Sequence, residues 1–300
     1  MAPYNKACRS RGGLWRVRVL VCADLLYGYL ALGSVHDGFC PMAADSLREP
    51  SEAGEQSFLH VLSAKWRELR EAPAVSAAGI GVRPAREAAE LRRLIGAGRR
   101  AGLPEAALAR IWRSLCGEIA AERGLSAVCV AGGDASQSVE AARGYFGFAP
   151  PVALLSSVRE ALERALSQQG ALACLPWPEP SGAGQWWAML NENRFHPLVI
   201  VDSWTCLSAG PAEATRVAIV GRMSLEPSGD DDMLAVAHDD NWTAEAQLRD
   251  LGLGAEVTAR ARSLVLIRLN EFVAPDDVRL DLARKAGLDG LRIVGVRPRL

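Results

Sequence analysis

The 300-residue chain lacks an excess of charge of either sign. Its formal net charge is −1 and its basic residues are scattered, so we expect no nucleic-acid surface. Apolar residues make up 49% and charged residues 23% of the chain, which is typical of a globular protein. A chain of this length holds about two or three domains. We predict a cytoplasmic protein.

Metal and disulfide signatures are also missing. The four histidines have no ligand spacing, and no two cysteines form a C-x-x-C pair. An odd number of cysteines argues against a disulfide framework, so we expect buried, reduced thiols and predict neither a metal site nor a cofactor. The seven cysteines are Cys8, Cys22, Cys40, Cys116, Cys129, Cys174 and Cys206.

Residues 1–43 have a pattern with more than one interpretation. Basic residues from Lys6 to Arg18 precede the apolar run Leu25–Val35, as in a signal peptide. Asp24 interrupts this pattern, and the run is far shorter than the ~20 residues that span a bilayer, so we expect no membrane segment. We interpret residues 1–43 as an N-terminal extension, either disordered or belonging to a start placed too early. An export signal is the alternative.

Residues 44–124 are predicted to form a domain of three helices. Apolar residues recur there at helical spacing, and Pro84 and Pro104 stand where the second and third helices begin. The stripes that we expect to face inward are Phe58, Leu59, Val61, Leu62, Trp66 and Leu69, then Ala88, Leu91, Leu94 and Ile95, then Leu108, Ile111, Trp112, Leu115 and Ile119.

Residues 125–225 alternate between short apolar runs and helical patterns. This βα alternation predicts a parallel sheet covered by helices, with a loop at residues 176–184 after the third strand, where α/β proteins often place their sites. The expected strands are 126–131, 152–155, 172–175, 198–201 and 216–221, and the expected helices are 136–145 and 158–168.

Residues 226–300 show the order βαββαβ, which is that of a ferredoxin-like unit. Asp230-Asp231-Asp232 is similar to an acidic metal loop, but no spaced partners follow, so we expect a solvated turn. The expected strands are 233–237, 256–260, 263–270 and 291–296, and the expected helices are 242–251 and 275–286.

Short motifs mark each region. Residues 82–87 read VRPARE, and residues 175–181 read LPWPEPS. Gly132-Gly133 precedes a helix that ends in Tyr145-Phe146-Gly147, and Thr215-Arg216-Val217 opens a strand. With these motifs, the chain from about residue 45 to 300 resembles an all-helical chorismate mutase fused to a prephenate dehydratase with a C-terminal ACT domain. The resemblance implies residues 44–124 for the mutase-like domain, 125–225 for the two-lobed α/β dehydratase-like domain and 226–300 for the ferredoxin-like ACT-like domain.

The mutase resemblance implies a set of site residues. Arg48, Lys65 and Arg86 take the positions of family cations, Glu87 that of the residue holding a substrate hydroxyl, and Arg83 stands beside them in VRPARE. Ile119 and Arg123 occupy positions where the family has Ser and Gln, and no lysine occurs between Glu68 and Gly81, where the family has one. The reaction is an intramolecular rearrangement of a dicarboxylate, which needs fixed cations and donors more than a base.

The dehydratase resemblance implies a second set. Thr215 takes the position of the threonine that helps to protonate the leaving hydroxyl, and Arg216 follows it. Glu179 and Ser181 lie in the loop where the family has an Asn that this chain lacks. In the ACT-like region, Arg260 is what remains of the family's ligand-binding segments, and the glycine near Trp242 is missing.

We therefore expect an isomerase that converts chorismate to prephenate in phenylalanine and tyrosine biosynthesis, with residual prephenate dehydratase function and a homodimer implied by resemblance. Chorismate or prephenate is the expected small-molecule ligand. The first alternative is a metabolite-binding or regulatory protein without catalysis, derived from the same fusion. The second is an exported solute-binding protein, which requires a true N-terminal signal.

Overall fold

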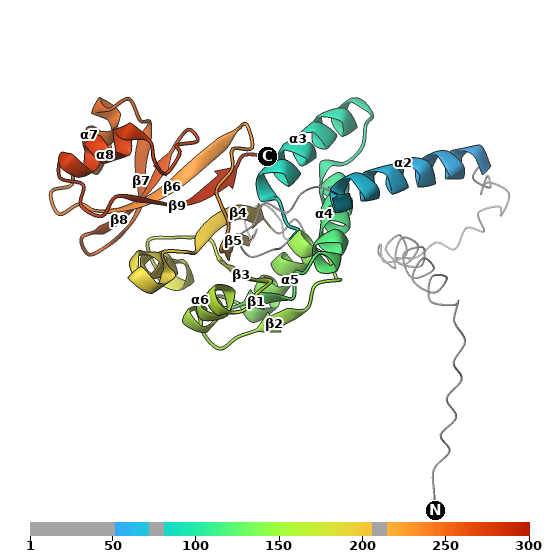
Figure 1. Ribbon diagram of the computed structural model, residues 1–300, viewed down its shortest axis with the longest axis horizontal. Helices are drawn as coiled ribbons and strands as arrows, with labels where there is room; N and C mark the ends of the chain where they lie inside the picture. The colour runs from blue at the N-terminus through green and yellow to red at the C-terminus, as the bar shows by residue number, and fades with distance from the viewer. Residues whose placement is uncertain (1–51, 72–80, 206–214) are drawn as a thin grey trace, which may run out of the picture. The chain divides into compact units, whose positions relative to one another are not determined.

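The computed structural model describes residues 52–71, 81–205 and 215–300 of the chain (Figure 1). The chain divides into residues 1–55 and 56–300, and all features below belong to the second unit except the first turn of helix α2. The predicted extension over residues 1–43 and the predicted site residue Arg48 lie outside the described residues. Within the described ranges, no helix has the length and apolar character needed to cross a membrane.

Three helices come first in the described part of the chain, as the apolar spacing predicts. They are α2 (Glu52–Glu71), α3 (Pro84–Arg100) and α4 (Glu105–Glu122). Pro84 is the first residue of α3, where the missing N–H costs no helical hydrogen bond, and Pro104 caps the start of α4. Gly102 has a φ of +71°, a conformation that ends α3 readily only because the residue has no side chain.

The predicted inward stripes are only partly right. On α2, Leu59 is 58% and Val61 65% exposed, because only the last turns of this helix contact the rest of the structure. On α4, Ile111 is 63% exposed, whereas the predicted Trp112 and Ile119 are buried, together with Arg113 and Cys116, which the prediction did not include. The buried stripe thus contains a charged residue, which an apolar-periodicity argument passes over.

A nine-stranded sheet follows, in the order β2-β1-β3-β5-β4-β9-β6-β8-β7. Strands β1 (Ala127–Val130), β2 (Val152–Leu154) and β3 (Ala171–Pro176) are parallel, as predicted. Strands β4 (Val199–Thr205) and β5 (Arg216–Gly221) are antiparallel to each other, so the predicted parallel sheet is wrong for this pair. The ten residues between them are too few for a helical crossover, and an antiparallel pairing needs none.

Helices cover both faces of this half of the sheet. Helix α6 (Val158–Ser167) packs on one face, while α5 (Ala135–Phe146) packs on the other together with α3 and α4. The predicted loop at residues 176–184 ends in the first turn of the 3-10 helix η2 (Gly182–Asn191), and a second one, η3 (Asn193–Phe195), follows. Their aromatic side chains Trp186, Trp187 and Phe195 are buried in the same core as α6.

The last third of the chain has the predicted βαββαβ order, with strands paired as β9-β6-β8-β7 and all neighbours antiparallel. Helices α7 and α8 pack together over one core (Figure 1). The elements are β6 (Asp231–His238), α7 (Ala244–Asp250), β7 (Ala255–Ala261), β8 (Leu264–Leu269), α8 (Val278–Lys285) and β9 (Arg292–Pro298).

The acidic run at residues 230–232 differs from the expected solvated turn. Asp231 and Asp232 are buried rather than solvated, because Asp231 accepts from the Ser228 backbone and Asp232 pairs with Arg297.

Strand β9 pairs with β4 at Gly295, where a side chain would meet Ile200 at 2.5 Å. The sheet is therefore continuous across residue 225, and the domain boundaries at residues 124 and 225 remain predictions.

Gly117 gives a test of the contact between α4 and α5. A Cβ atom there would lie 1.6 Å from the Phe146 carbonyl oxygen, so the two helices approach closely only because this residue is glycine. We expect Gly117→Ala to lower the free energy of unfolding by about 1–3 kcal/mol or more through overpacking. Gly96→Ala is the matched control, since its Cβ would meet only the end of Arg100 at 4.0 Å, and it should stabilise α3 slightly. Urea unfolding of both variants measures the difference.

Candidate active site

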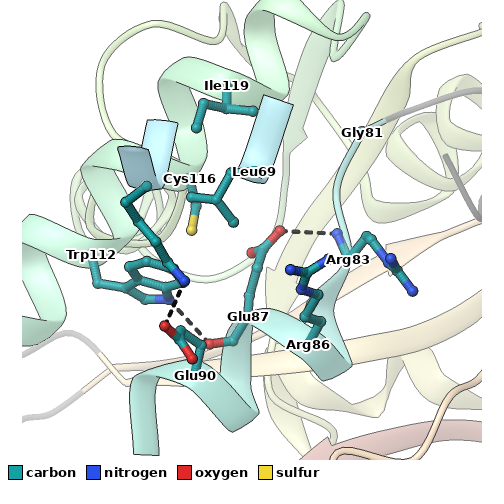
Figure 2. A pocket seen from close by; sticks show the side chains of 10 residues that line it. Leu69, Gly81, Arg83, Arg86, Glu87, Glu90, Trp112, Cys116 and Ile119 are labelled. Carbon is teal, nitrogen blue, oxygen red and sulfur yellow. Dashed lines mark hydrogen bonds and ion pairs between the residues drawn. The ribbon is translucent and has the colours of Figure 1, made fainter. Parts of the chain in front are cut away.

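A pocket lies between the last turns of α2, the start of α3 and the inner face of α4 (Figure 2). It is partly open to solvent. Three helices that are separate in sequence contribute to it. The lining residues are Lys65, Leu69, Gly81, Arg83, Arg86, Glu87, Glu90, Trp112, Cys116 and Ile119.

The predicted mutase residues are largely brought together here. Lys65, Arg83, Arg86, Glu87 and Ile119 all line the pocket. Figure 2 shows the Glu87 carboxylate pointing inward, with the two arginines on one side of it and Trp112 and Glu90 on the other. The local reason is the start of α3, which projects residues 83, 86 and 87 from one helical turn.

Glu87 is held in one orientation at the floor of the pocket. It is only 7% exposed, and its Oε1 accepts a hydrogen bond of 2.9 Å from the backbone N–H of Arg83. Its Oε2 lies 3.3 Å from Nη1 of Arg113. Trp112 Nε1 donates to the Glu87 backbone carbonyl at 3.1 Å, which ties α4 to α3 at the same point.

Burial and charge act on Glu87 in opposite directions. Burial raises the pKa of this carboxyl above its ordinary value, because the charged form loses its hydration, while the Arg113 guanidinium opposes the shift. Glu87 at the helix start also benefits from the positive end of the α3 dipole. Free lone pairs on the carboxylate can accept a hydrogen bond from a hydroxyl group.

Two cations of the pocket are paired with carboxylates. Lys65 Nζ lies 2.6 Å from Glu90 and 3.0 Å from Glu68, and Arg86 Nη2 lies 2.6 Å from Glu68. Arg83 is less engaged, since its guanidinium pairs with Glu226 at the longer distance of 3.8 Å. The pocket thus offers three cations, of which two must exchange partners to bind an external anion.

The remaining lining residues are apolar side chains and one thiol. Leu69, Ile119 and the Trp112 indole lie there together with Cys116. Burial raises the pKa of the Cys116 thiol well above its ordinary value, so this group is protonated at neutral pH. Sequence reasoning missed Glu90, Cys116 and Arg113, although the i, i+4 spacing of 112 and 116 places both on the inner face of α4.

Arg123 lies at the edge of the pocket rather than in it. Its Nη1 donates to the Leu69 carbonyl at 3.0 Å, and its side chain packs against Gly81, where an added Cβ would come within 2.5 Å. Both contacted residues line the pocket. Arg123 therefore joins the end of α4 to the end of α2 and to the segment that enters α3.

The predicted dehydratase residues do not line this pocket. Thr215 Oγ1 lies 2.6 Å from Gln137 Oε1, and the Arg216 guanidinium lies 5.8 Å from the centre of the Trp177 ring. Glu179 and Ser181 are exposed in the loop after β3. Burial lowers the pKa of Arg216, and the nearby Arg297 adds to this shift.

Chemically, the pocket suits a small anion with an apolar part and a hydroxyl group. Arg83 and Arg86 on one side of Glu87 and Lys65 on the other can bind carboxylates. Glu87 can accept from a hydroxyl, and the apolar lining excludes water. Among the residues that the structure describes, no group of three or more His, Cys, Asp or Glu side chains gathers to hold a metal ion.

Comparison with known proteins gives few matches. No family model matches the chain, and no curated protein matches it. Among the solved structures that match, three resemble 58% of it: GqqA, described as a novel type of quorum quenching acylase, and the prephenate dehydratases of Arthrobacter aurescens, in complex with L-Phe, and of Streptococcus mutans. Their identities are 16%, 15% and 17%, their TM-scores 0.44, 0.44 and 0.41, and the matches cover 95%, 90% and 100% of their own chains. With TM-scores this low, the resemblance carries no argument about the chemistry of this chain.

Glu90 predicts a pH dependence of stability. Hydrogen bonds from Arg93 and Lys65 lower the pKa of this carboxyl to about 2, against an ordinary value of 4.5. A pKa lowered by folding stabilises the protein above the unfolded value, and this contribution is lost as the pH falls from about 4.5 toward about 2. We expect Glu90→Gln to cost about 1 kcal/mol of unfolding free energy at pH 7, with the cost shrinking across that window.

Urea unfolding at pH 7, 5, 4 and 3 measures this cost. Glu118→Gln is the control, since Glu118 is exposed on α4 and pairs with no cation among the described residues. A cost for Glu90→Gln that stays constant down to pH 3 would contradict the assignment.

Proposed function

We propose that this protein is a chorismate mutase-type isomerase that converts chorismate to prephenate in phenylalanine and tyrosine biosynthesis. One observation carries the proposal. Lys65 on α2 and the Arg86-Glu87 pair at the start of α3, each implied by the sequence resemblance, line a single pocket although they belong to two different helices. Convergence of this kind is not required by helix packing, and it supports a shared binding role.

The pocket fits the demands of that reaction. Chorismate carries two carboxylates and a hydroxyl, and its rearrangement needs no covalent intermediate, so orientation and charge stabilisation do most of the work. In the proposal, Arg86 binds one carboxylate, Lys65 and Arg83 supply cations for the second carboxylate and the developing negative charge, and Glu87 accepts from the hydroxyl. Ile119 and Leu69 supply the apolar lining that keeps water away.

Further predictions for the chain stay proposals. Residual prephenate dehydratase function would rest on Thr215 and Arg216, with Glu179 and Ser181 nearby in the loop after β3. A homodimer would cover the exposed residues Leu59 and Val61 of α2. Neither is needed for the mutase proposal.

The test is an assay with purified protein and chorismate, following the loss of its ultraviolet absorbance. We expect turnover above the spontaneous rate, and we expect Arg86→Ala to lower kcat/KM by about 10²–10³-fold, the usual effect of losing one charged donor. Arg110→Ala is the matched control, because Arg110 is an exposed arginine on α4 outside the pocket, and it should behave as wild type.

The same assay distinguishes the isomerase from the alternative of a metabolite-binding protein without catalysis. Absence of turnover at high protein concentration, with no difference between wild type and Arg86→Ala, would overturn the proposal. If calorimetry then shows that chorismate or prephenate binds and that Arg86→Ala weakens it, the metabolite-binding alternative stands instead.

Glu68 offers an independent prediction. The Glu68 carboxylate forms ion pairs with both Lys65 and Arg86. The hydrogen bond from Lys65 is the main cause of the lowered pKa of Glu68. Substrate carboxylates must displace the Glu68 carboxylate, so Glu68→Gln should lower KM for chorismate about three- to tenfold, as expected for removing a competing exposed ion pair worth about 1 kcal/mol. Glu122→Gln, an exposed carboxylate at the end of α4, is the control. An unchanged or higher KM in Glu68→Gln would contradict this competition.

A further inference from the structure

Behind the pocket, four polar side chains form a fully buried cluster that joins the helices to the sheet. The cluster consists of Glu87 on α3, Arg113 on α4, Tyr145 on α5 and Asp202 on β4. We propose that Arg113 is a positioning residue for the Glu87 carboxylate, and that Asp202 on the sheet and Tyr145 on α5 hold Arg113 in place. This inference rests on the proposed function. It adds that Asp202 on strand β4 fixes the orientation of the Glu87 carboxylate through Arg113.

The geometry shows how one guanidinium serves two carboxylates. Arg113 is 0% exposed, and its Nη2 lies 2.9 Å from Asp202 Oδ2 while its Nη1 lies 3.3 Å from Glu87 Oε2. The guanidinium is planar, so its two N–H groups point in directions fixed relative to each other. The position of Asp202 therefore sets the direction of the bond to Glu87.

Asp202 is the better anchored of the two carboxylates. Tyr145 OH donates to its Oδ2 at 2.7 Å, and the backbone N–H of Ser203 donates to its Oδ1 at 2.7 Å. The Arg113 guanidinium also lies 4.0 Å from the centre of the Tyr145 ring. Arg113 is thus held mainly by Asp202 and Tyr145, and the hydrogen bond that it donates to Glu87 in the pocket is the longer of its two.

A purely structural role does not account for the side chains involved. An ion cluster in a dry core gains little stability over an apolar replacement, because desolvation offsets the attraction. Here the cluster ends at a pocket, and it fixes both oxygens of Glu87, one through Arg83 N–H and the other through Arg113. Such control of both oxygens is what a carboxylate needs in order to present its remaining lone pairs to a ligand.

The cluster also sets the protonation of Glu87. The charged and titratable groups that face it are Lys65 on α2, Arg83 just before α3, Arg86 and Glu90 on α3, Arg113 and Cys116 on α4, Tyr145 on α5 and Asp202 on β4. Burial is the largest influence and raises the pKa of Glu87, Arg113 opposes it, and the negative charge of Asp202 raises it further. Removing the charge of Asp202 should therefore lower the pKa of Glu87.

The central variant is Asp202→Asn, which keeps the shape of the side chain. Turnover requires ionised Glu87, so activity falls as the pH drops through its pKa. We expect the acid limb of the kcat/KM profile of Asp202→Asn to move down by about one pH unit, as for loss of one nearby like charge. Arg113→Lys keeps the charge but loses the planar fork, and it should lower kcat on the order of 10²-fold while KM changes less than about threefold.

Two further variants keep the test decisive if Arg113→Lys does not fold. Tyr145→Phe retains the ring beside Arg113 and removes only its hydrogen bond to Asp202. It should lower kcat several-fold without moving KM. Asp239→Asn is the matched control, since Asp239 is also buried and pairs with Arg260 at 2.9 Å in the βαββαβ half. It should lower stability and leave both the pH profile and kcat unchanged.

A readout without turnover separates this inference from the proposed function. Carbon-13 NMR of glutamate-labelled protein follows the titration of Glu87, whose signal is assigned by its loss in Glu87→Gln. A lower Glu87 pKa in Asp202→Asn than in wild type and Asp239→Asn supports the inference even if chorismate is not turned over. An unchanged Glu87 titration, or equal kinetic effects of Asp202→Asn and Asp239→Asn, overturns it while leaving the mutase proposal intact.

Discussion

The buried guanidinium of Arg113 is the constraint on which the arrangement of helices and sheet depends. It sits where α3, α4, α5 and β4 meet, and it bonds to carboxylates on two of them. Removing one partner of such a cluster leaves an uncompensated charge in the core, which typically costs about 3–5 kcal/mol. The close contact of Gly117 with Phe146 lies one turn further along α4 and holds the same helices at the distance that the cluster requires.

Helix α3 contributes to the pocket through its first turn and contacts the segment before β6 through a later turn. Its first turn carries Arg86 and Glu87, while Arg92, further along, donates to the Ser228 carbonyl at 3.0 Å. Ser228 in turn donates from its backbone to Asp231, the first residue of β6. The element that shapes the pocket therefore also contacts the entry to the βαββαβ half, so a displacement of α3 would be felt in both places.

Much of this architecture follows from local sequence signals, and the rest depends on long-range contacts. Pro84 and Pro104 mark helix starts, and the βαββαβ order of the last third can be read from its apolar runs. The antiparallel pairing of β4 and β5 and the exposure of Leu59 and Ile111 cannot, because each depends on which surface the neighbouring elements leave open. The pocket residues Lys65, Arg86 and Glu87 were predicted from motif positions, whereas Arg113 resembles any helix arginine until Asp202, 89 residues later, is placed beside it.

The pairing of Lys65 and Arg86 with Glu68 affects how anion binding in the pocket depends on ionic strength. A binding site with bare cations attracts any anion, and its affinity falls steeply as ionic strength rises. In the proposed function, an entering carboxylate takes the place of the Glu68 carboxylate, so the number of ion pairs at Lys65 and Arg86 is nearly the same before and after. Binding then acts as an exchange of internal for external counter-ions. Such a site tolerates changes in salt and rejects small inorganic anions, which cannot make the contacts with Glu87 and the apolar lining that favour the exchange.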